Sequence, residues 1–234
     1  MAPLLSAVVV AAGRSERFLR ELGELPGAST SSSKLLIAWE GKALIRHTVE
    51  KLFSLPLQQM VIVGRQEDFS DFEDSLIGLP ERSRIKFALG GNRRQDSVRN
   101  GLAALDSADM VLVHDGARPF VSADFLKSLL DRSQNAEALI PAVPVYETLK
   151  EIDEDGFVVR TVNRNAFVRV QTPQFFRFDL LRAAHQKMAE SDQEFTDDAA
   201  LMEACGYRVR VVPGHPENIK VTLPEDLKFK GIHV

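Results

Sequence analysis

Hydrophobic and polar residues follow one another along the chain in two alternating patterns. Short, largely apolar segments are typical of strands buried on both faces of a sheet, and they lie within 7–12, 58–64, 84–89, 109–120 (a strand followed by a turn) and 136–145. Between them, apolar residues recur every three to four positions, as in helices with one buried face, over 42–55, 69–79, 94–107 and 122–133. This alternation predicts an α/β protein whose mostly parallel, doubly wound sheet carries helices on both faces.

A hydroxyl-rich segment interrupts the alternation after the first strand. It runs from Gly23 to Lys34 and contains glycine, proline and several serines, with few apolar residues. This composition is typical of a solvated loop, although a long loop in a compact domain often serves as a lid over a site. We therefore expect a loop here, with a functional lid as the alternative.

A second interruption follows the last apolar run, at about 144–170. Two alternating segments flank Asp153 to Gly156, an acidic run that ends in glycine and is typical of a tight turn. The pattern predicts a β-hairpin arm that protrudes from a single domain spanning 1–234. Such an arm has little core of its own, so we expect it to pack against a second copy of the chain in a homodimer.

The composition is that of an ordinary soluble protein, with 44% hydrophobic and 26% charged residues among 234. The net charge of −4 provides no basic field for nucleic acid. No apolar stretch reaches the ~20 residues that cross a bilayer. We expect neither a nucleic-acid nor a membrane partner. The single cysteine, Cys205, cannot form an internal disulfide, which favours a reducing, cytoplasmic location and a packing role for this side chain.

The first apolar run has two interpretations, a secretory signal or a strand. A signal needs basic residues before an apolar stretch of roughly 7–15 residues. Residues 1–6 contain no lysine or arginine, and the apolar run at 7–12 is short and rich in valine. We therefore interpret this run as a strand that leads into a ligand-binding loop.

The first strand ends in residues suited to an anionic ligand, and ligands of open α/β sheets lie at the carboxyl ends of the strands. Ala11, Ala12 and Gly13 let backbone N–H groups approach a phosphate, and Arg17 can neutralise its charge. The spacing matches neither a dinucleotide-binding loop nor a Walker A loop. A solvent-facing arginine turn stays open as the alternative.

Two further strand ends carry candidate chemistry. After Gly91, the side chains of Asn92 and Ser97 offer amide and hydroxyl groups that can recognise the edge of a base, unless they only form a turn and a helix cap. Asp115 ends another strand beside Gly116. A carboxylate there is suited to Mg²⁺, which binds a few carboxylates together with substrate phosphates, unless it forms a structural ion pair.

A lysine near the end of the sequence is a further candidate. Lys220 alternates with Ile219 and Val221 on what we expect to be a short strand, so its side chain faces the opposite side, toward either the site or solvent. Thr222 is expected to cap the helix that begins at the following Pro-Glu-Asp sequence.

Six motifs in order connect these candidates to a known family: AAGRSERF, GGNRRQDSVRNGL, VHDGARPF, TPQFF, FTDDA and NIKVTLPEDL. Together they cover most of the chain and resemble the 2-C-methyl-D-erythritol 4-phosphate cytidylyltransferases of the non-mevalonate isoprenoid pathway. The resemblance implies a Rossmann-like nucleotidyltransferase fold with a dimerising β-arm. It also implies transfer of CMP from CTP to the phosphate of methylerythritol phosphate, with Mg²⁺ as cofactor and release of pyrophosphate.

The resemblance also implies a role for each candidate residue. Catalytic cations would be Arg17, Lys34 and Lys220. Residues at the nucleotide would be Ala11, Ala12, Gly13, Gly91, Asn92, Ser97, Asp115 and Gly116, with Asp115 also holding the metal. The sugar-alcohol phosphate would meet Arg118, Thr148, Arg164, Thr172, Thr196 and Lys220, with Arg164 reaching the substrate of the partner subunit.

Two departures from the family pattern accompany the resemblance. Asn92 stands where the family commonly has an aspartate, and Ser33 precedes Lys34 where a proline is often found. Two alternatives stay open at this point. One is a ribitol 5-phosphate cytidylyltransferase, which shares the nucleotide site, and the other is a nucleotide-binding regulatory module without turnover.

Overall fold

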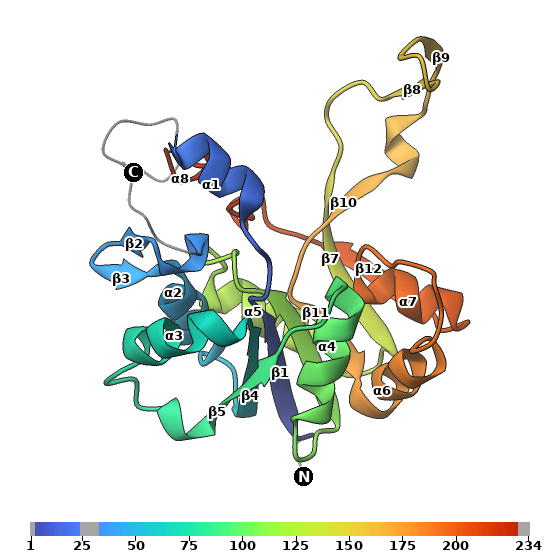
Figure 1. The fold of residues 1–234 in the computed structure, drawn as a ribbon. Helices are drawn as coiled ribbons and strands as arrows, with labels where there is room; N and C mark the ends of the chain where they lie inside the picture. Colours follow the sequence, from blue (N-terminus) through green and yellow to red (C-terminus); the bar gives the residue numbers. More distant parts are fainter. Residues whose placement is uncertain (1–2, 24–32, 229–234) are drawn as a thin grey trace.

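The computed structural model describes residues 3–23 and 33–228, in which an eight-stranded sheet forms the centre (Figure 1). Its strand order is β10-β7-β11-β6-β1-β4-β5, with β12 paired to β7. The strands are β1 Leu5–Val10, β4 Leu57–Gly64, β5 Ile85–Leu89, β6 Met110–Asp115, β7 Ala138–Pro144, β10 Val168–Val170, β11 Gln174–Arg177 and β12 Val209–Pro213. Strands β1, β4, β5 and β6 run parallel, whereas β11 is antiparallel to β6 and β7. The predicted mostly parallel α/β sheet is confirmed.

Helices cover both faces of this sheet, as predicted. The helices are α1 Glu16–Gly23, α2 Leu44–Leu52, α3 Phe69–Ser75, α4 Arg94–Ala103, α5 Ala123–Ser133, α6 Phe178–Lys187, α7 Asp198–Ala204 and α8 Glu225–Lys228. Side chains of α2, α3 and α5 join one hydrophobic cluster, and those of α4, α6 and α7 join a second. Strand β1 serves both clusters because its side chains alternate: Ala7 and Val9 face the first cluster and Val8 faces the second.

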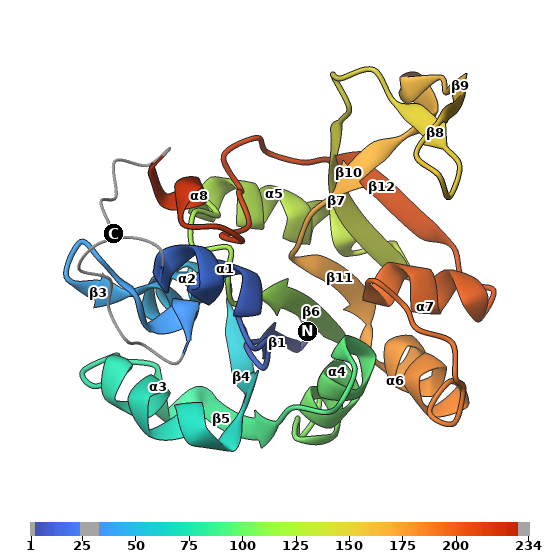
Figure 2. The same cartoon turned by 45° about the horizontal axis from the view of Figure 1, so that its top comes forward.

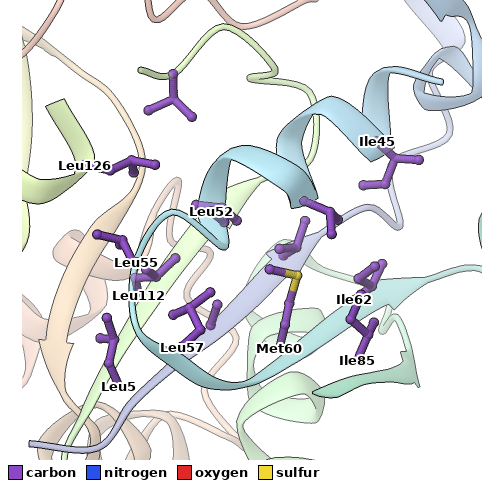
Figure 3. Packing of buried hydrophobic residues seen from close by; sticks show 14 of the residues in the cluster. Leu5, Ile45, Leu52, Leu55, Leu57, Met60, Ile62, Ile85, Leu112 and Leu126 are labelled. Carbon is purple, nitrogen blue, oxygen red and sulfur yellow. The ribbon is translucent and has the colours of Figure 1, made fainter. Parts of the chain in front are cut away.

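The first cluster forms where α2 lies on the sheet (Figure 3). Ile45 and Leu52 of α2 pack over Met60 and Ile62 of β4, and all four side chains are fully buried. Cys205 is partly buried against the second cluster, which agrees with the packing role expected for it.

A third, smaller cluster joins segments that are far apart in the sequence. Phe18 of α1, Leu44 of α2 and Val221 near the end of the chain are all fully buried in it. Arg17 and Lys220 are the sequence neighbours of two of these residues. The cluster therefore holds the two chain segments that carry these cations on the same side of the sheet.

The predicted arm leaves the body beside β7 and β10 and projects away from the sheet (Figures 1 and 2). Its tip is a two-stranded antiparallel ribbon of β8 Lys150–Ile152 and β9 Val158–Thr161. The turn falls at the predicted acidic run, where Gly156 has a φ of +88°, a left-handed conformation that glycine adopts freely. All residues of both arm strands are exposed.

Two local predictions near the C-terminus are wrong. Lys220 lies in no strand, and the next residue, Val221, is held by a hydrogen bond from its N–H to the carbonyl of Ala117. Thr222 does not cap α8 with its hydroxyl. Instead the carboxylate of Asp226, inside the helix, accepts hydrogen bonds from the N–H groups of Thr222 and Leu223, because it reaches back to the unpaired donors before the first turn.

Candidate active site

A cavity of about 900 Å³ opens at the carboxyl ends of β1 and β6, beside α1 and the start of α4. We call it the central cleft. It collects most of the candidates that the sequence predicts for the nucleotide and the cations. They are Ala11, Ala12, Gly13, Arg17, Lys34, Gly91, Asn92, Ser97, Asp115 and Lys220.

The loop after β1 forms one wall of this cleft. The N–H of Ala11 donates to the carbonyl of Val63 at 2.7 Å, which ties the end of β1 to β4. A Cβ placed on Gly13 would meet nothing within 4 Å, so this position faces open space. Arg17 follows on α1 with an exposed side chain, while the adjacent Phe18 is fully buried and anchors the helix. The end of β1 is therefore fixed by its backbone, and open space remains at Gly13.

Lys34 also lines the central cleft, and in the sequence it ends the hydroxyl-rich segment. Residues 24–32, and with them most of the hydroxyl-rich loop and its expected lid function, lie outside the described part of the chain. Ser33 is buried and its hydroxyl caps a short 3-10 helix at Lys34–Leu36 by accepting from the N–H of Leu35. Burial, together with the nearby charges of Lys220 and Arg17, lowers the pKa of Lys34 to about 8. Such a lysine is crowded by positive charge and gains from an arriving anion.

The glycine pair after β5 packs against protein rather than leaving a flat surface for a ligand. A Cβ on Gly90 would lie 2.4 Å from the Cβ of Ala12, and one on Gly91 would lie 2.4 Å from the Cβ of Asp96. Both positions therefore need glycine because the chain packs closely around them. Ser97 accepts a hydrogen bond from the N–H of Gly91 at 3.0 Å, which fixes this part of the cleft wall.

Asp115 lies at the floor of the cleft and is surrounded by cations. Its Oδ2 lies 2.9 Å from the Nζ of Lys220, and its oxygens lie 3.7 Å from the guanidinium groups of Arg94 and Arg118. Burial by itself would raise the pKa of Asp115, but the charges of Lys220, Arg94 and Arg118 outweigh it and hold the pKa well below its usual value. The carboxylate is therefore ionised at neutral pH and orders three cations around one point.

A second cavity of about 280 Å³ adjoins the floor of the cleft; we call it the side pocket. Arg118, Thr172 and Thr196, predicted for the sugar phosphate, line it. Thr172 is buried, and its hydroxyl accepts a hydrogen bond from the N–H of Asp115 at 3.0 Å. It also lies 3.0 Å from the Nδ1 of His114. Burial lowers the pKa of His114 to about 4, so this histidine is neutral and serves to hold Thr172 in place.

Three predicted site residues do not line either cavity of the described chain. Gly116 is buried beneath the cleft, where a Cβ would meet Ile45 and Leu35 at 3.1 and 3.3 Å. Contact of Gly116 with a ribose therefore stays a prediction. Thr148 and Arg164 are exposed on the arm, and Arg164 donates a hydrogen bond to the carbonyl of Tyr146. Within one chain, these two side chains are not brought to the cleft.

The structure adds an arginine that the sequence did not single out. Arg94, at the start of α4, lines both cavities and pairs with the buried Asp198 at 2.7 Å. The sequence signal was the pair Arg93-Arg94, but a pair does not show how each member is held. Arg93 lines only the central cleft and pairs with Asp96, whose carboxylate also accepts a hydrogen bond from the N–H of Arg93 at the helix start.

The donor set for a metal ion is small. Among the described residues, no group of three or more His, Cys, Asp or Glu side chains lies together. Asp115 is the ionised carboxylate at the cleft floor, and Mg²⁺ in nucleotide sites uses one or two carboxylates plus phosphate oxygens. Asp115 therefore fits a Mg²⁺ ion that arrives with a nucleotide, and it does not by itself form a site for a free ion.

Comparison with known proteins identifies the chain's relatives. The family model for 2-C-methyl-D-erythritol 4-phosphate cytidylyltransferase matches residues 5–232. A protein of that name from Clostridium botulinum is 34% identical over 96% of this chain and 96% of its own length. Another from Bacillus velezensis is 38% identical, over 95% of this chain and 92% of its own length.

Solved structures agree with the sequence matches. The structure of 4-diphosphocytidyl-2C-methyl-D-erythritol synthase from Anaerococcus prevotii has a TM-score of 0.81 and 30% identity, covering 97% of this chain and 95% of that one. The 2-C-methyl-D-erythritol 4-phosphate cytidylyltransferase from Thermus thermophilus has a TM-score of 0.75 and 31% identity, covering 97% and 96%. These matches confirm the predicted nucleotidyltransferase fold. In the described residues, no helix is both long and apolar enough to traverse a lipid bilayer.

Proposed function

Because the chain belongs to the 2-C-methyl-D-erythritol 4-phosphate cytidylyltransferase family of nucleotidyltransferases, we propose that it makes 4-diphosphocytidyl-2-C-methyl-D-erythritol from CTP and 2-C-methyl-D-erythritol 4-phosphate. An oxygen of the acceptor phosphate attacks the α-phosphorus of CTP and forms the new P–O bond. The bond between the α-phosphorus and its bridging oxygen breaks, and the electron pair leaves with pyrophosphate. No general base is needed, since the attacking phosphate oxygen is already an anion.

The observation that carries this proposal is the convergence of cations from separate chain segments on one cleft. Arg17 of α1, Lys34 after the loop and Lys220 near the C-terminus all line it. Transfer between phosphates needs positioning and neutralisation of charge more than covalent help from the protein. Arg17 and Lys34 would hold the triphosphate, and Lys220 would turn from Asp115 toward the reacting phosphates.

The two cavities suggest how the substrates divide the site. The triphosphate and cytosine would occupy the central cleft, with Ala11, Ala12 and Gly13 along the nucleotide and Gly91, Asn92 and Ser97 at the base. The acceptor phosphate would occupy the side pocket, next to Arg118, Thr172 and Thr196. Asp115 and Lys220 line both cavities and would lie where the two substrates meet.

Mg²⁺ would be held by Asp115 together with oxygens of the triphosphate. When bound, the ion supplies positive charge that neutralises the triphosphate and makes pyrophosphate a better leaving group. The 2.9 Å contact between Lys220 and Asp115 occupies this carboxylate in the free protein. The ion is therefore expected to bind with the nucleotide and not before it.

The arm supports assembly of two copies of the chain. Tyr146, Ile152 and Phe157 expose 68%, 61% and 72% of their surface, an unusual amount for large apolar side chains on a protruding element. A second copy packed on the arm would cover them. It would also bring Thr148 and Arg164 to the acceptor pocket of the partner, which is the role that the family resemblance implies for Arg164.

One assay tests the proposed reaction. The purified protein is incubated with CTP, Mg²⁺ and one of two acceptors, 2-C-methyl-D-erythritol 4-phosphate or ribitol 5-phosphate, and pyrophosphate release is followed. We expect release with the first acceptor and little with the second. Turnover of ribitol 5-phosphate alone would overturn the choice of acceptor. Binding of CTP without release of pyrophosphate from either mixture would favour a regulatory module.

A further inference from the structure

Three residues line both the central cleft and the side pocket: Arg94, Asp115 and Lys220. Asp115 and Lys220 already have roles in the proposed reaction. The sequence assigned no role to Arg94, although Arg94 also lines both cavities. Its side chain is about a quarter exposed, at 23%, so a ligand in either cavity can reach it.

A residue that lines both cavities lies where the two proposed substrates meet. The inference drawn from this position rests on the proposed function. The α-phosphoryl group of CTP is transferred together with the cytidine that it stays bonded to in the cleft, and it exchanges its bond to pyrophosphate for a bond to the acceptor phosphate in the side pocket. It must therefore lie at the boundary that the two cavities share. We infer that the guanidinium of Arg94 contacts the transferred phosphoryl group and stabilises its charge during transfer.

The hydrogen bonds of Arg94 leave part of its guanidinium available for this contact. Nη1 donates to the Oδ2 of Asp198 at 2.7 Å. Nη2 lies 3.7 Å from the nearest oxygen of Asp115, which is too long for a hydrogen bond. Within the described part of the chain, Nη2 therefore retains donor capacity toward the cavities. A phosphate oxygen is a suitable acceptor for it.

The neighbouring Arg93 provides an internal contrast. Its Nε and Nη2 both donate to Asp96 at 3.0 Å, and its Nη1 donates to the carbonyl of Ser191 at 2.7 Å. The side chain of Arg93 therefore makes three hydrogen bonds within the protein and lines only the central cleft. Among the described residues, the side chain of Arg94 makes one and lines both cavities, so it offers more free donors at their boundary.

Arg94 is held in place by a buried pair behind it. Asp198 and His185 are 1% and 2% exposed, and the Nε2 of His185 lies 3.1 Å from the Oδ1 of Asp198. Burial would raise the pKa of Asp198, but Arg94 and His185 lower it, so the carboxylate is charged and His185 donates to it. Asp198 thus fixes one side of the guanidinium and directs the other toward the cavities. In this arrangement Asp198 and His185 are positioning residues.

The test compares Arg94→Met and Arg94→Lys with Arg99→Met as the matched control. Arg99 lies on the same helix, is about a third exposed and pairs with Asp96. Steady-state rates with CTP and 2-C-methyl-D-erythritol 4-phosphate give kcat and KM, and titration with CTP gives the nucleotide affinity. We expect Arg94→Met to lower kcat about 10²–10³-fold, as does loss of one donor to a developing oxyanion. CTP affinity should change less than tenfold, Arg94→Lys should retain more turnover than Arg94→Met, and Arg99→Met should match the unmodified protein.

A double variant separates contact with substrate from a structural role. Arg94→Met alone leaves Asp198 as an unpaired buried charge and is expected to lower the melting temperature. Arg94→Met/Asp198→Asn removes both charges and should restore the melting temperature while turnover stays low. If turnover returned with stability, or if Arg94→Met kept normal kcat, the inference would be overturned. Failure of the unmodified protein to release pyrophosphate would refute the proposed function instead, so the two outcomes are distinguishable.

Discussion

The central cleft and the arm differ in how much buried structure surrounds their charged residues. In the cleft, Arg17, Lys34, Asp115 and Lys220 are each adjacent in sequence to a buried residue that fixes the backbone. On the arm, Arg164 lies between two exposed asparagines, and both arm strands are exposed throughout (Figure 2). The packing of one chain therefore positions the cleft residues, whereas the arm residues are held only by contacts within the exposed arm, such as that of Arg164 with the carbonyl of Tyr146. A role for the arm in catalysis requires a second copy of the chain.

The largest expected effect tests the cleft side of this comparison. Replacing Arg17 by Met should lower kcat/KM for CTP about 10²–10³-fold, since it removes one cation from the triphosphate. The control is Arg20→Met, which removes an exposed arginine one turn further along α1. Steady-state pyrophosphate release measures both. Equal losses in the two variants would mean that general charge, and not the place of Arg17 in the cleft, sets the rate.

The arm side is tested by mixing two variants with lowered activity. Arg164→Ala should lower the rate about tenfold or more through lost contact with the acceptor phosphate, and Lys220→Ala should lower it further. Unfolding and refolding the two variants together forms mixed dimers in which one site has both side chains. The mixture should regain about a quarter of the normal activity, because half of the dimers carry one complete site of two. A mixture no more active than its components would show that Arg164 does not act across the dimer.

The lowered pKa of Lys34 in the cleft predicts that the use of CTP depends on pH. The protonated lysine is the form that attracts the triphosphate, and its pKa is about 8 in the free protein. The value of kcat/KM for CTP should therefore fall as pH rises above 8, by up to about tenfold per unit. Bound triphosphate favours the charged lysine, so the fall in kcat should occur at higher pH. Lys34→Arg should remove the fall near pH 8, and a profile unchanged in that variant would assign it to another group.

The smallest expected effect compares the same substitution in the core and on the arm. Ile62→Val removes a methylene group from a fully buried position and should lower the free energy of unfolding by about 0.5–1.5 kcal/mol. Ile152→Val, at a position with 61% exposure, should change it by less than about 0.5 kcal/mol in dilute solution. Denaturant unfolding measures both. If the Ile152 effect grows with protein concentration, the arm packs on a partner, as proposed.

The hydrophobic pattern predicts the body of the fold well, because its strands and helices bury one or both faces. The parallel core, the helices on both of its faces and the arm turn all follow from residue spacing. Strands β11 and β12 were not predicted. In β12 only Val212 is buried, so its sequence lacks the continuous apolar run that marks a strand buried on both faces. The segment at Lys220 is not a strand, since single contacts to Ala117 and Asp115 hold it in place of a ladder of hydrogen bonds.

The sequence likewise predicts some residues of the candidate site and misses another. Residues that follow buried strands, such as Asp115 and Ala11 to Gly13, were placed correctly in the cleft by the rule that ligands lie at strand ends. Arg94 was missed because its orientation depends on Asp198, 104 positions further along the chain. No local pattern distinguishes it from Arg93. The long-range pair with Asp198 fixes the orientation of Arg94 beside both cavities, which no local pattern shows.

A crystal structure of the protein with CTP and Mg²⁺ would show directly whether the cations of the central cleft bind the triphosphate. We expect the triphosphate in the central cleft along Ala11 to Gly13, with Arg17, Lys34 and Lys220 within contact distance of phosphate oxygens. Lys220 should have left Asp115, from which it lies 2.9 Å in the free protein. A triphosphate bound elsewhere on the surface, or one in the cleft without these cations around it, would contradict the account.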